Sequence, residues 1–367
     1  MYAHVIRRHT WQNALLAMLF IAAAVLLLQY PDAVHTGMNR GLSICSTVII
    51  PTLFPFMLLS GWLADSPLCR HPGRLMQAIT RRVFALPGCC GPAILLSLVG
   101  GYPAGIVAIS RLYRQGQIRR EEMRRMTQFC FCGGPGFIVG TVGIGLMGST
   151  QAGWMLYIAQ AITAVMIGVW LGRGQSVAAS PRTITAPQRR LAHTVADSCG
   201  ALLSMCGFVT AAAMALSLWE GIGLSRGIAD LTGWSAATVS AAVSGLLEIS
   251  GGCIAVAQAP LAPLWLSLCL GWGGISVHGQ LAAVLAEERV LSGRFFGWRC
   301  IHGLLSGGVA MLLFHLFPPQ RSTDASALSP IPFSASLSAT VMLLLLCFLT
   351  MLCFSEKKTG NYTTGVL

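Results

Sequence analysis

Charged side chains are scarce in this chain of 367 residues. Asp, Glu, Lys and Arg together make up 10% of the residues, whereas 54% are hydrophobic. A soluble domain carries about 25% charged residues, so there is too little polar surface here to cover a water-soluble globule. The scarcity excludes a soluble protein of this size and predicts a membrane protein.

Lysine is almost missing. Of the 24 basic residues only Lys357 and Lys358 are lysines, and the net charge is +12. The arginines lie in short loops between apolar runs, which is the pattern that sets membrane orientation when basic loops stay in the cytoplasm. We therefore expect topology determinants and no nucleic-acid partner.

Motifs of catalysis are also missing. The sequence has no nucleophile elbow, phosphate loop, paired-histidine zinc motif or dinucleotide fingerprint. Most of the 13 cysteines lie inside apolar runs, where cysteine acts as a small hydrophobe. The pairs Cys89-Cys90 and Cys130-x-Cys132 lack the spacing and the histidines of a zinc site. No enzyme activity, metal or cofactor is predicted.

What the sequence does contain is a series of apolar segments. They span residues 11–30, 41–63, 84–110, 127–147, 152–171, 196–219, 236–258, 261–285, 300–317 and 334–354. The first is long enough to cross a bilayer and has no clean cleavage site after it, so we interpret it as a retained helix and not a signal peptide.

Two of these segments, 84–110 and 236–258, are interrupted by Gly and Pro. The loops on both sides of 84–110 are rich in arginine, so both are expected in the cytoplasm. A segment with both ends on one side must be a re-entrant hairpin; its arm from Pro87 to Val99 would be about 20 Å of helix, half the way across. This threading leaves all basic residues but Arg40, Arg226 and Arg321 inside, with both termini cytoplasmic.

The same threading divides the chain into two halves of opposite orientation. Each half contains a helix, a hairpin, a glycine-broken helix and a further helix, the first half at residues 41–171 and the second at 196–317. A cytoplasmic linker at 172–195 joins the halves. Residues 1–40 and 318–367, each with one further predicted crossing, flank them. Double glycines fall at matching places, Gly100-Gly101 with Gly251-Gly252 at the hairpin tips and Gly133-Gly134 with Gly273-Gly274 in the next helices. The fold class predicted is an all-α polytopic membrane protein with an inverted-topology repeat, two re-entrant hairpins and two broken helices. The alternative is that these glycines only pack helices closely, as we expect of Gly307-Gly308.

Polar groups at membrane depth are candidates for a binding site. Glu248 is the main one, because it is the acidic residue placed nearest the midplane, and broken helices around it would expose backbone groups that bind ions. The predicted substrate-binding set is Gly100, Gly101, Tyr102, Pro103, Gly133, Gly134, Pro135, Glu248, Ser250, Gly251, Gly252, Gly273, Gly274, Ser276, His278 and Gln280. A structural role for Glu248, capping backbone N–H groups, is the alternative. Asp197 is expected near the interface, and the basic connector 111–126 is expected on the cytoplasmic surface against anionic lipid.

Several of these stretches resemble a known family. Pro51 to Phe56, Gly101-Tyr-Pro-Ala-Gly105, the Arg-Glu-Glu connector, Phe129 to Phe137 and Gly271 to Gln280 are similar to the YlbJ-like sporulation integral membrane proteins of the Gate, or nucleoside-recognition, superfamily. The resemblance covers roughly residues 40–317. One departure is Phe131-Cys-Gly-Gly-Pro-Gly136, where family members often carry Asn or Ser, so backbone groups would have to serve as ligands.

The resemblance implies a multi-pass permease of the cell membrane that moves a small anionic metabolite such as dipicolinate during spore formation. A nucleoside or nucleobase transporter of the same architecture is the second hypothesis, since the superfamily includes concentrative nucleoside transporters. A non-transporting scaffold for spore envelope assembly is the third hypothesis. The expected partners are a small-molecule substrate and the bilayer; a homo-oligomer and the coupling ion are left open.

Overall fold

The computed structural model of the protein describes residues 2–64, 74–177, 191–285 and 292–319. These residues form helices joined by short connections, with no strand among them. Four helical stretches in the described residues are long and apolar enough to cross a membrane, and a fifth arises if two sharply bent helices are counted as one. The protein is an all-α polytopic membrane protein, as predicted. The predicted last crossing, 334–354, lies outside the described residues, as do residues 178–190 of the predicted linker.

The chain begins with helices that follow one another almost without interruption. They are α1 (Tyr2–Gln29), α2 (Pro31–Ile44), the π-helical η1 (Cys45–Ile49) and α3 (Ile50–Ala64). Residues 31–63 form one apolar stretch, so the prediction that the second crossing begins at residue 41 is wrong. Within residues 31–40, Gly37 allows a close approach to another helix: a Cβ on Gly37 would lie 2.5 Å from the Cα of Met214.

The first hairpin follows α5 (Arg74–Phe84) and η2 (Gly88–Cys90) and consists of α6 (Gly91–Arg114). Its helical path breaks at Gly101, whose φ of 77° and ψ of −167° are open in practice only to glycine. A Cβ on Gly105 would lie 2.4 Å from the Cβ of Ser97, although residues eight apart in a straight helix are separated by about 12 Å. The two arms therefore fold back on each other, which confirms the predicted hairpin with its tip at Gly101.

The first broken helix consists of α7 (Arg120–Phe129) and the π-helical η3 (Gly136–Leu146), and α8 (Thr150–Gly172) completes this half. Residues 130–134 between them leave the helical path, so the predicted break is confirmed, although the helix begins at Arg120 and not at 127. The basic face of 111–126 is exposed, as the amphipathic pattern predicts, and its contact with anionic lipid stays a prediction. Met123 and Met126 are fully buried, because the apolar face of α7 packs into the protein and only its basic face is exposed.

The second half contains α9 (Leu191–Gly221), α10 (Leu224–Thr232), α11 (Ala236–Leu247), α12 (Ile249–Val256), α13 (Ala262–Trp272), α14 (Gly274–Val284) and α15 (Gly293–Leu316). A Cβ on Gly252 would lie 2.4 Å from the Cα of Gly245, so α11 and α12 also fold back as a hairpin. Its turn is at Glu248, within the predicted tip at 248–252, and Gly252 lets the arms touch. Helix α15 begins at Gly293 and not at residue 300, and α10 was not predicted.

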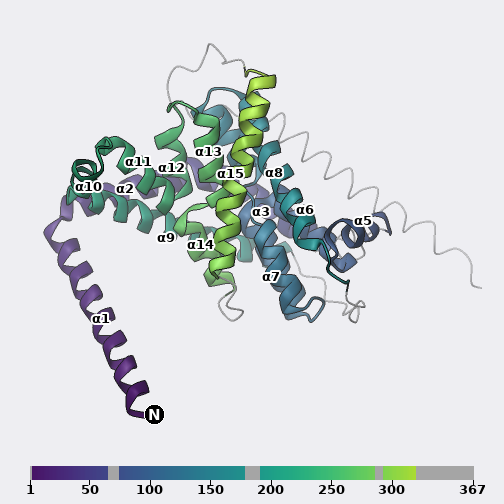
Figure 1. Ribbon diagram of the computed structural model, residues 1–367, viewed down its shortest axis with the longest axis horizontal. Coiled ribbons are helices and arrows are strands. Elements are labelled where there is room, and N and C mark those ends of the chain that lie inside the picture. Colours follow the sequence, from purple (N-terminus) through teal and green to yellow (C-terminus); the bar gives the residue numbers. More distant parts are fainter. Residues whose placement is uncertain (1, 65–73, 178–190, 286–291, 320–367) are drawn as a thin grey trace, which may run out of the picture.

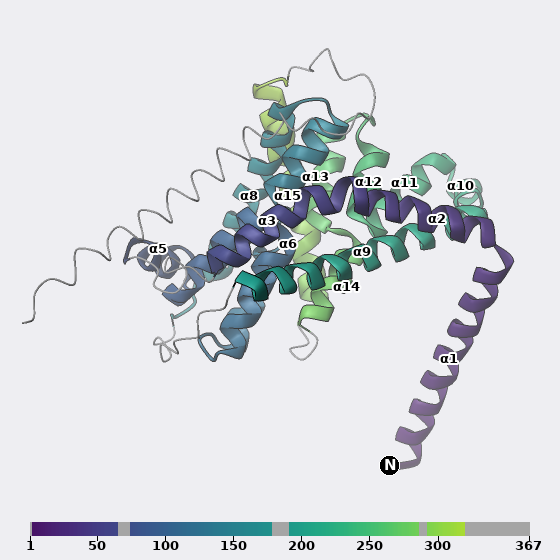
Figure 2. The ribbon, with the colours of Figure 1, turned by 180° about the vertical axis from the view of Figure 1, so that it is seen from behind.

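The first helices of the two halves pack against each other in opposite directions. Cβ atoms added to Gly41 and Gly61 would lie 2.6 Å from Thr210 and 2.6 Å from Thr194, so residue numbers rise along α2 and α3 while they fall along α9. Figure 2 shows these helices side by side along the back of the molecule. Equivalent helices of an inverted repeat run antiparallel in this way.

Close glycine contacts also recur in matching places. In the first half the broken helix meets the following helix where a Cβ on Gly143 would lie 2.3 Å from the Cα of Gly153, and in the second half a Cβ on Gly271 would lie 2.3 Å from the Cα of Gly303. Each half thus has a hairpin crossing and a helix crossing at small residues. The glycines both break helices and pack them.

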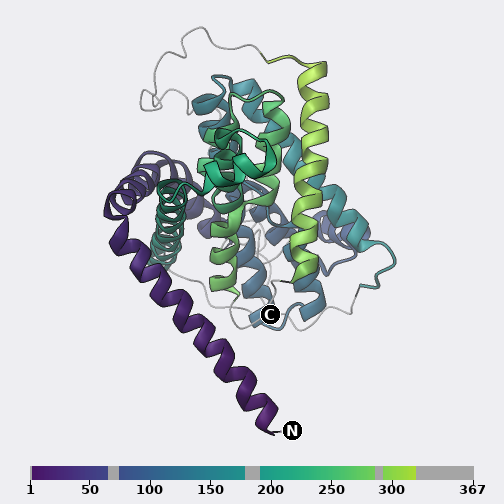
Figure 3. The same cartoon turned by 60° about the vertical axis from the view of Figure 1, so that its left-hand side comes forward.

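Helices α8, α13 and α15 stand side by side in the middle of the molecule, with α5 towards one end and α10 towards the other (Figure 1). Helix α1 leaves this body as a single rod (Figure 3). Its apolar side chains, such as Leu16, Phe20 and Leu28, are 63%, 79% and 82% exposed. An exposed apolar helix of this kind suits contact with lipid.

Candidate functional site

The first hairpin and the first broken helix meet at their interruptions. A Cβ on Gly101 would lie 2.9 Å from the backbone nitrogen of Gly134, and a Cβ on Gly134 would lie 3.2 Å from the Cα of Gly101. The hydroxyl of Tyr102 lies 3.4 Å from the position of a Cβ on Gly133. Two backbones can approach this closely only without side chains between them. We call this contact between Gly101 and Gly134 the first junction.

The second half repeats the arrangement. A Cβ on Gly274 would lie 3.0 Å from the Cα of Glu248 and 3.0 Å from the carbonyl oxygen of Leu247. Gly273 and Gly274 have φ angles of 87° and 78°, which allow α13 to end and α14 to begin in a sharp turn. This contact between Glu248 and Gly274 is the second junction.

The two junctions contact each other. The Tyr102 hydroxyl donates a hydrogen bond of 2.5 Å to the carbonyl oxygen of Leu270, in the last turn of α13. Phe131, in the break between α7 and η3, lies 3.1 Å from the position of a Cβ on Gly273. The last carbonyls of a helix have no partner within it, so Tyr102 satisfies one of them from the other half. All four interruptions therefore converge in one buried place.

Glu248 is 5% exposed and links α11 to α12. Its Oε2 accepts a hydrogen bond of 2.7 Å from the backbone N–H of Gly251, so the carboxylate caps α12. This is the structural alternative that the sequence left open. Oε1 has no hydrogen-bond partner among the described residues, nor have the hydroxyls of Ser244 and Ser276. The cap therefore occupies one carboxylate oxygen and leaves the other without a partner among the described residues.

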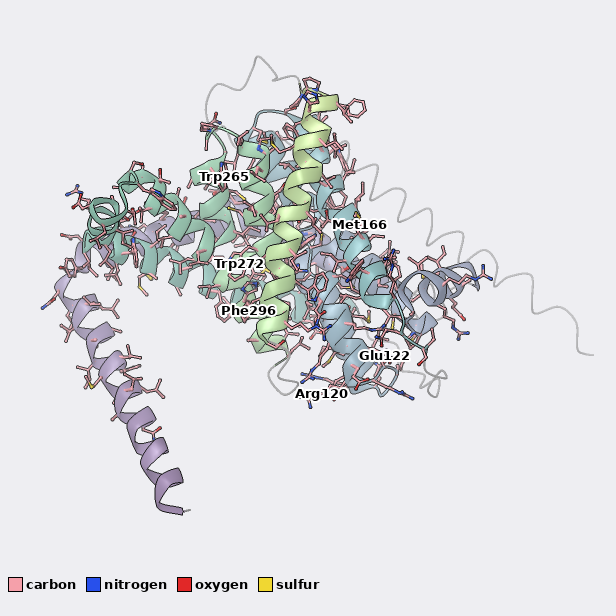
Figure 4. The ribbon with its side chains drawn as sticks, in the orientation of Figure 1. Arg120, Glu122, Met166, Trp265, Trp272 and Phe296 are labelled. Carbon is pink, nitrogen blue, oxygen red and sulfur yellow. The ribbon has the colours of Figure 1, made fainter. Side chains whose placement is uncertain are left out.

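His278, on α14, is 3% exposed and lies among aromatic rings. The ring centroids are 4.6 Å away for Trp272, 5.2 Å for Phe296, 5.5 Å for Phe295 and 5.8 Å for Phe131. Figure 4 shows Trp272 and Phe296 close to each other beside the lower part of α15, with Arg120 below them at the start of α7. Neither nitrogen of His278 has a hydrogen-bond partner among the described residues. Flat apolar walls around a polar ring are typical of small-molecule sites.

Sequence reasoning missed Arg299, which was counted among the cytoplasmic arginines because its helix was predicted to begin at residue 300. It is fully buried on α15 and donates hydrogen bonds to the carbonyl oxygens of Gln128 and Phe131, beside the C-terminal end of α7. Its guanidinium lies 5.2 Å from the ring centroid of Phe131 and 5.8 Å from that of Phe295. The spacing of Arg299, His302 and Ser306 on one helix face is the signal that could have found it.

Arg299 makes no ion pair within the described part of the chain. Its guanidinium is hydrogen-bonded to backbone carbonyl oxygens, which are neutral. Burying a cation costs several kcal/mol. The partial negative charge at a helix C-terminus returns at most about 2 kcal/mol. Arg299 therefore places a cation without a carboxylate partner among the described residues 5.2 Å from the ring of Phe131.

Arg299 also contacts a network of buried polar side chains. Its Nη1 lies 3.4 Å from Nδ1 of His302, and the other ring nitrogen of His302 lies 3.0 Å from the carbonyl oxygen of Gln160 on α8. The Gln160 amide donates to the carbonyl oxygen of Ser267 at 3.0 Å and to the hydroxyl of Ser306 at 2.9 Å. All of these side chains are fully buried. The network fixes α15 against α8 and α13.

The other predicted site residues differ in how deeply they are buried. Those that are buried there are Gly100, Pro135, Ser250 and Gly251. Gln280 is half-buried further along α14, and of Pro103 only the backbone is described. Asp197 is exposed and pairs with Arg111, consistent with the interfacial position expected for it.

Comparison with known proteins identifies one relative. The chain is 26% identical over 335 residues to the sporulation integral membrane protein YlbJ of Bacillus subtilis (strain 168), and the match covers 82% of each chain. The chain is thus similar to this YlbJ protein over most of its length. No family model matches it, and no solved structure does.

For this protein the multi-pass membrane location is supported by the relative and by the apolar helices together. Its membership of the wider Gate superfamily, the orientation of its termini and the choice of cell membrane stay predictions. So does the role of the junction residues in binding.

Proposed function

We propose that this protein is a permease that moves a small organic anion across a membrane during spore formation. The observation that carries the proposal is the convergence of four helix interruptions in one buried place, between two halves whose first helices pack antiparallel. In inverted-repeat transporters such interruptions form the substrate site, and the halves move against each other to expose it alternately. The link to spore formation rests on the relative's name.

An anion is favoured as cargo by the charges around the junctions. Arg299 is a buried cation without a carboxylate partner in the described residues, and Phe131 separates it from the junctions by one ring. Glu248 is the acidic group at the site, and one of its oxygens already binds Gly251. If Glu248 carries a proton that accompanies the substrate, it is neutral when the anion binds, and the site then has a net positive charge.

A nucleoside or nucleobase is the second candidate cargo. The aromatic rings around His278 favour it, because a flat base stacks on such rings as readily as an aromatic carboxylate does. A membrane scaffold without transport is the third hypothesis, and it predicts no flux of either compound.

The test is uptake of labelled dipicolinate into proteoliposomes that contain the purified protein. We expect saturable uptake that unlabelled dipicolinate competes away and nucleosides do not. Competition by nucleosides would favour the second candidate. No uptake of either compound, from a protein whose gene deletion still blocks spore envelope assembly, would support the scaffold.

A further inference from the structure

Three buried side-chain oxygens around the second junction have no hydrogen-bond partner among the described residues. They are Oε1 of Glu248 and the hydroxyl oxygens of Ser244 and Ser276. The three side chains are 5%, 4% and 5% exposed. A buried polar atom without a partner destabilises a protein, so several of them in one region indicate a bound ion or water.

Ser244 and Glu248 flank the same point of the second hairpin. A Cβ on Gly251 would lie 2.8 Å from the hydroxyl oxygen of Ser244 and 3.6 Å from Oε2 of Glu248. Ser244 precedes Glu248 by one helical turn, and its carbonyl oxygen accepts a hydrogen bond of 2.8 Å from the backbone N–H of Glu248. Both side chains therefore lie where α11 and α12 stand side by side (Figure 1).

Helix α14 packs against the same turn. A Cβ on Gly274, at its start, would lie 3.0 Å from the Cα of Glu248 and 3.0 Å from the carbonyl oxygen of Leu247. Ser276 follows two residues later. The last carbonyls of α11 face this turn, because helix carbonyls point towards the C-terminus and the last four have no partner within the helix. Carboxylate, hydroxyl and carbonyl oxygens are thus gathered around one turn.

The charges at the turn favour a monovalent cation. Glu248 supplies one carboxylate, which caps Gly251 through Oε2 and is also hydrogen-bonded by Ser250. Arg40 acts on this carboxylate electrostatically but makes no ion pair with it within the described residues. The part of the chain that the structure describes has no group of three His, Cys, Asp or Glu side chains suited to a metal ion. One carboxylate among neutral oxygens balances one positive charge and suits a hard cation.

We propose that the second junction binds a sodium ion through Oε1 of Glu248 and the hydroxyl of Ser244, with the carbonyls at the end of α11 and the hydroxyl of Ser276 as further ligands. Helix ends and unwound backbone coordinate sodium in this way in transporters with broken helices. A bound sodium ion neutralises Glu248 as a proton would, which favours an anionic substrate. The coupling of this ion to transport rests on the proposed function, and its binding does not. The simpler explanation, that ordered water satisfies these oxygens, predicts no difference between sodium and other cations.

The first test measures sodium binding in detergent solution, where no transport occurs. Sodium chloride replaces choline chloride at constant ionic strength and pH, and the midpoint of thermal unfolding is followed. A ligand that binds only the folded protein stabilises it, so we expect sodium to raise the midpoint by a few degrees. Glu248→Gln keeps a cap for Gly251 but removes the charge, and it should abolish the rise. Ser244→Ala should increase the sodium concentration required severalfold.

Matched variants separate the site from general effects of salt. Glu220→Gln removes an exposed carboxylate of α9 that accepts a hydrogen bond from Ser240. Ser267→Ala removes a buried hydroxyl that also lacks a partner among the described residues but lies on α13 beside Gln160. Both variants should keep the full rise. Equal midpoints in sodium and choline for the wild-type protein, or an undiminished rise in Glu248→Gln, would overturn the proposal.

The second test follows uptake of labelled dipicolinate into proteoliposomes with an inward sodium gradient, and with choline in its place. We expect the sodium gradient to accelerate uptake by the wild-type protein and to have no effect on Glu248→Gln. Sodium binding without any uptake would leave the cation site standing and reject the permease. Uptake that is independent of sodium, by a protein whose midpoint sodium does not raise, would reject the cation site alone.

Discussion

A single substitution at Gly101 should disrupt the first junction. Its backbone conformation is unfavourable for any other residue by about 1–3 kcal/mol. A side chain would also press on the backbone nitrogen of Gly134 from 2.9 Å, and overpacking of this kind costs about 1–3 kcal/mol more. Gly101→Val should therefore disfavour the first junction by roughly 2–6 kcal/mol. We expect it to abolish transport while the protein still inserts in the membrane.

Gly116 supplies the matched control. Its φ of 67° is also positive, but nothing lies within 4 Å of the position of its Cβ. Gly116→Ala should cost only about 1–2 kcal/mol of backbone strain and retain transport. Membrane fractionation gives the amount inserted, and initial uptake rates are divided by it. Normal uptake by a well-inserted Gly101→Val protein would refute the role of the junction.

Three further predictions concern the same architecture. Glu248→Gln keeps a cap for the N–H of Gly251 and should remove the dependence of uptake on pH between 5 and 8. Glu248→Ala should lose uptake. If uptake by the Gln variant kept its full dependence on pH, Glu248 would have only the capping role. Tyr102→Phe deletes the hydrogen bond to Leu270 and should destabilise the protein by about 1 kcal/mol, seen as a lower midpoint of thermal unfolding, with slower uptake; an unchanged midpoint and rate would show that this bond does not couple the halves. A cysteine at position 116 should resist an impermeant label added outside the cell, and strong labelling would contradict the cytoplasmic placement of this loop.

The hairpins could be predicted because basic loops and glycines constrain them independently. Arginines on both sides of 84–110 favoured a hairpin over a single crossing, and Gly100-Gly101 then marked its tip. The second tip was predicted at 248–252 and lies at Glu248, but the role of Gly251-Gly252 was open, because a double glycine gives the same sequence signal whether it forms a turn or a close contact between arms. Only the packing of Gly252 on Gly245 distinguishes these roles.

The burial of Arg299 and of the apolar face of α7 was missed for a common reason. A run of charges predicts a solvated face, but α7 also carries Met123 and Met126 on its other face, and these are buried. Arg299 sits one residue outside the apolar segment that hydropathy defines. The helix C-terminus that makes its burial tolerable belongs to another part of the chain. Such long-range compensation leaves no local signal in a single sequence.

The convergent helix breaks are proposed to form the transport site. The measurement that tests it most directly is the initial rate of labelled dipicolinate uptake into proteoliposomes, compared between wild-type protein, Gly116→Ala and Gly101→Val at equal inserted amounts. We expect uptake by the wild-type protein and by Gly116→Ala. Uptake by Gly101→Val should not exceed that of protein-free vesicles. Equal uptake by all three, or by none of them for dipicolinate and nucleosides alike, would contradict it.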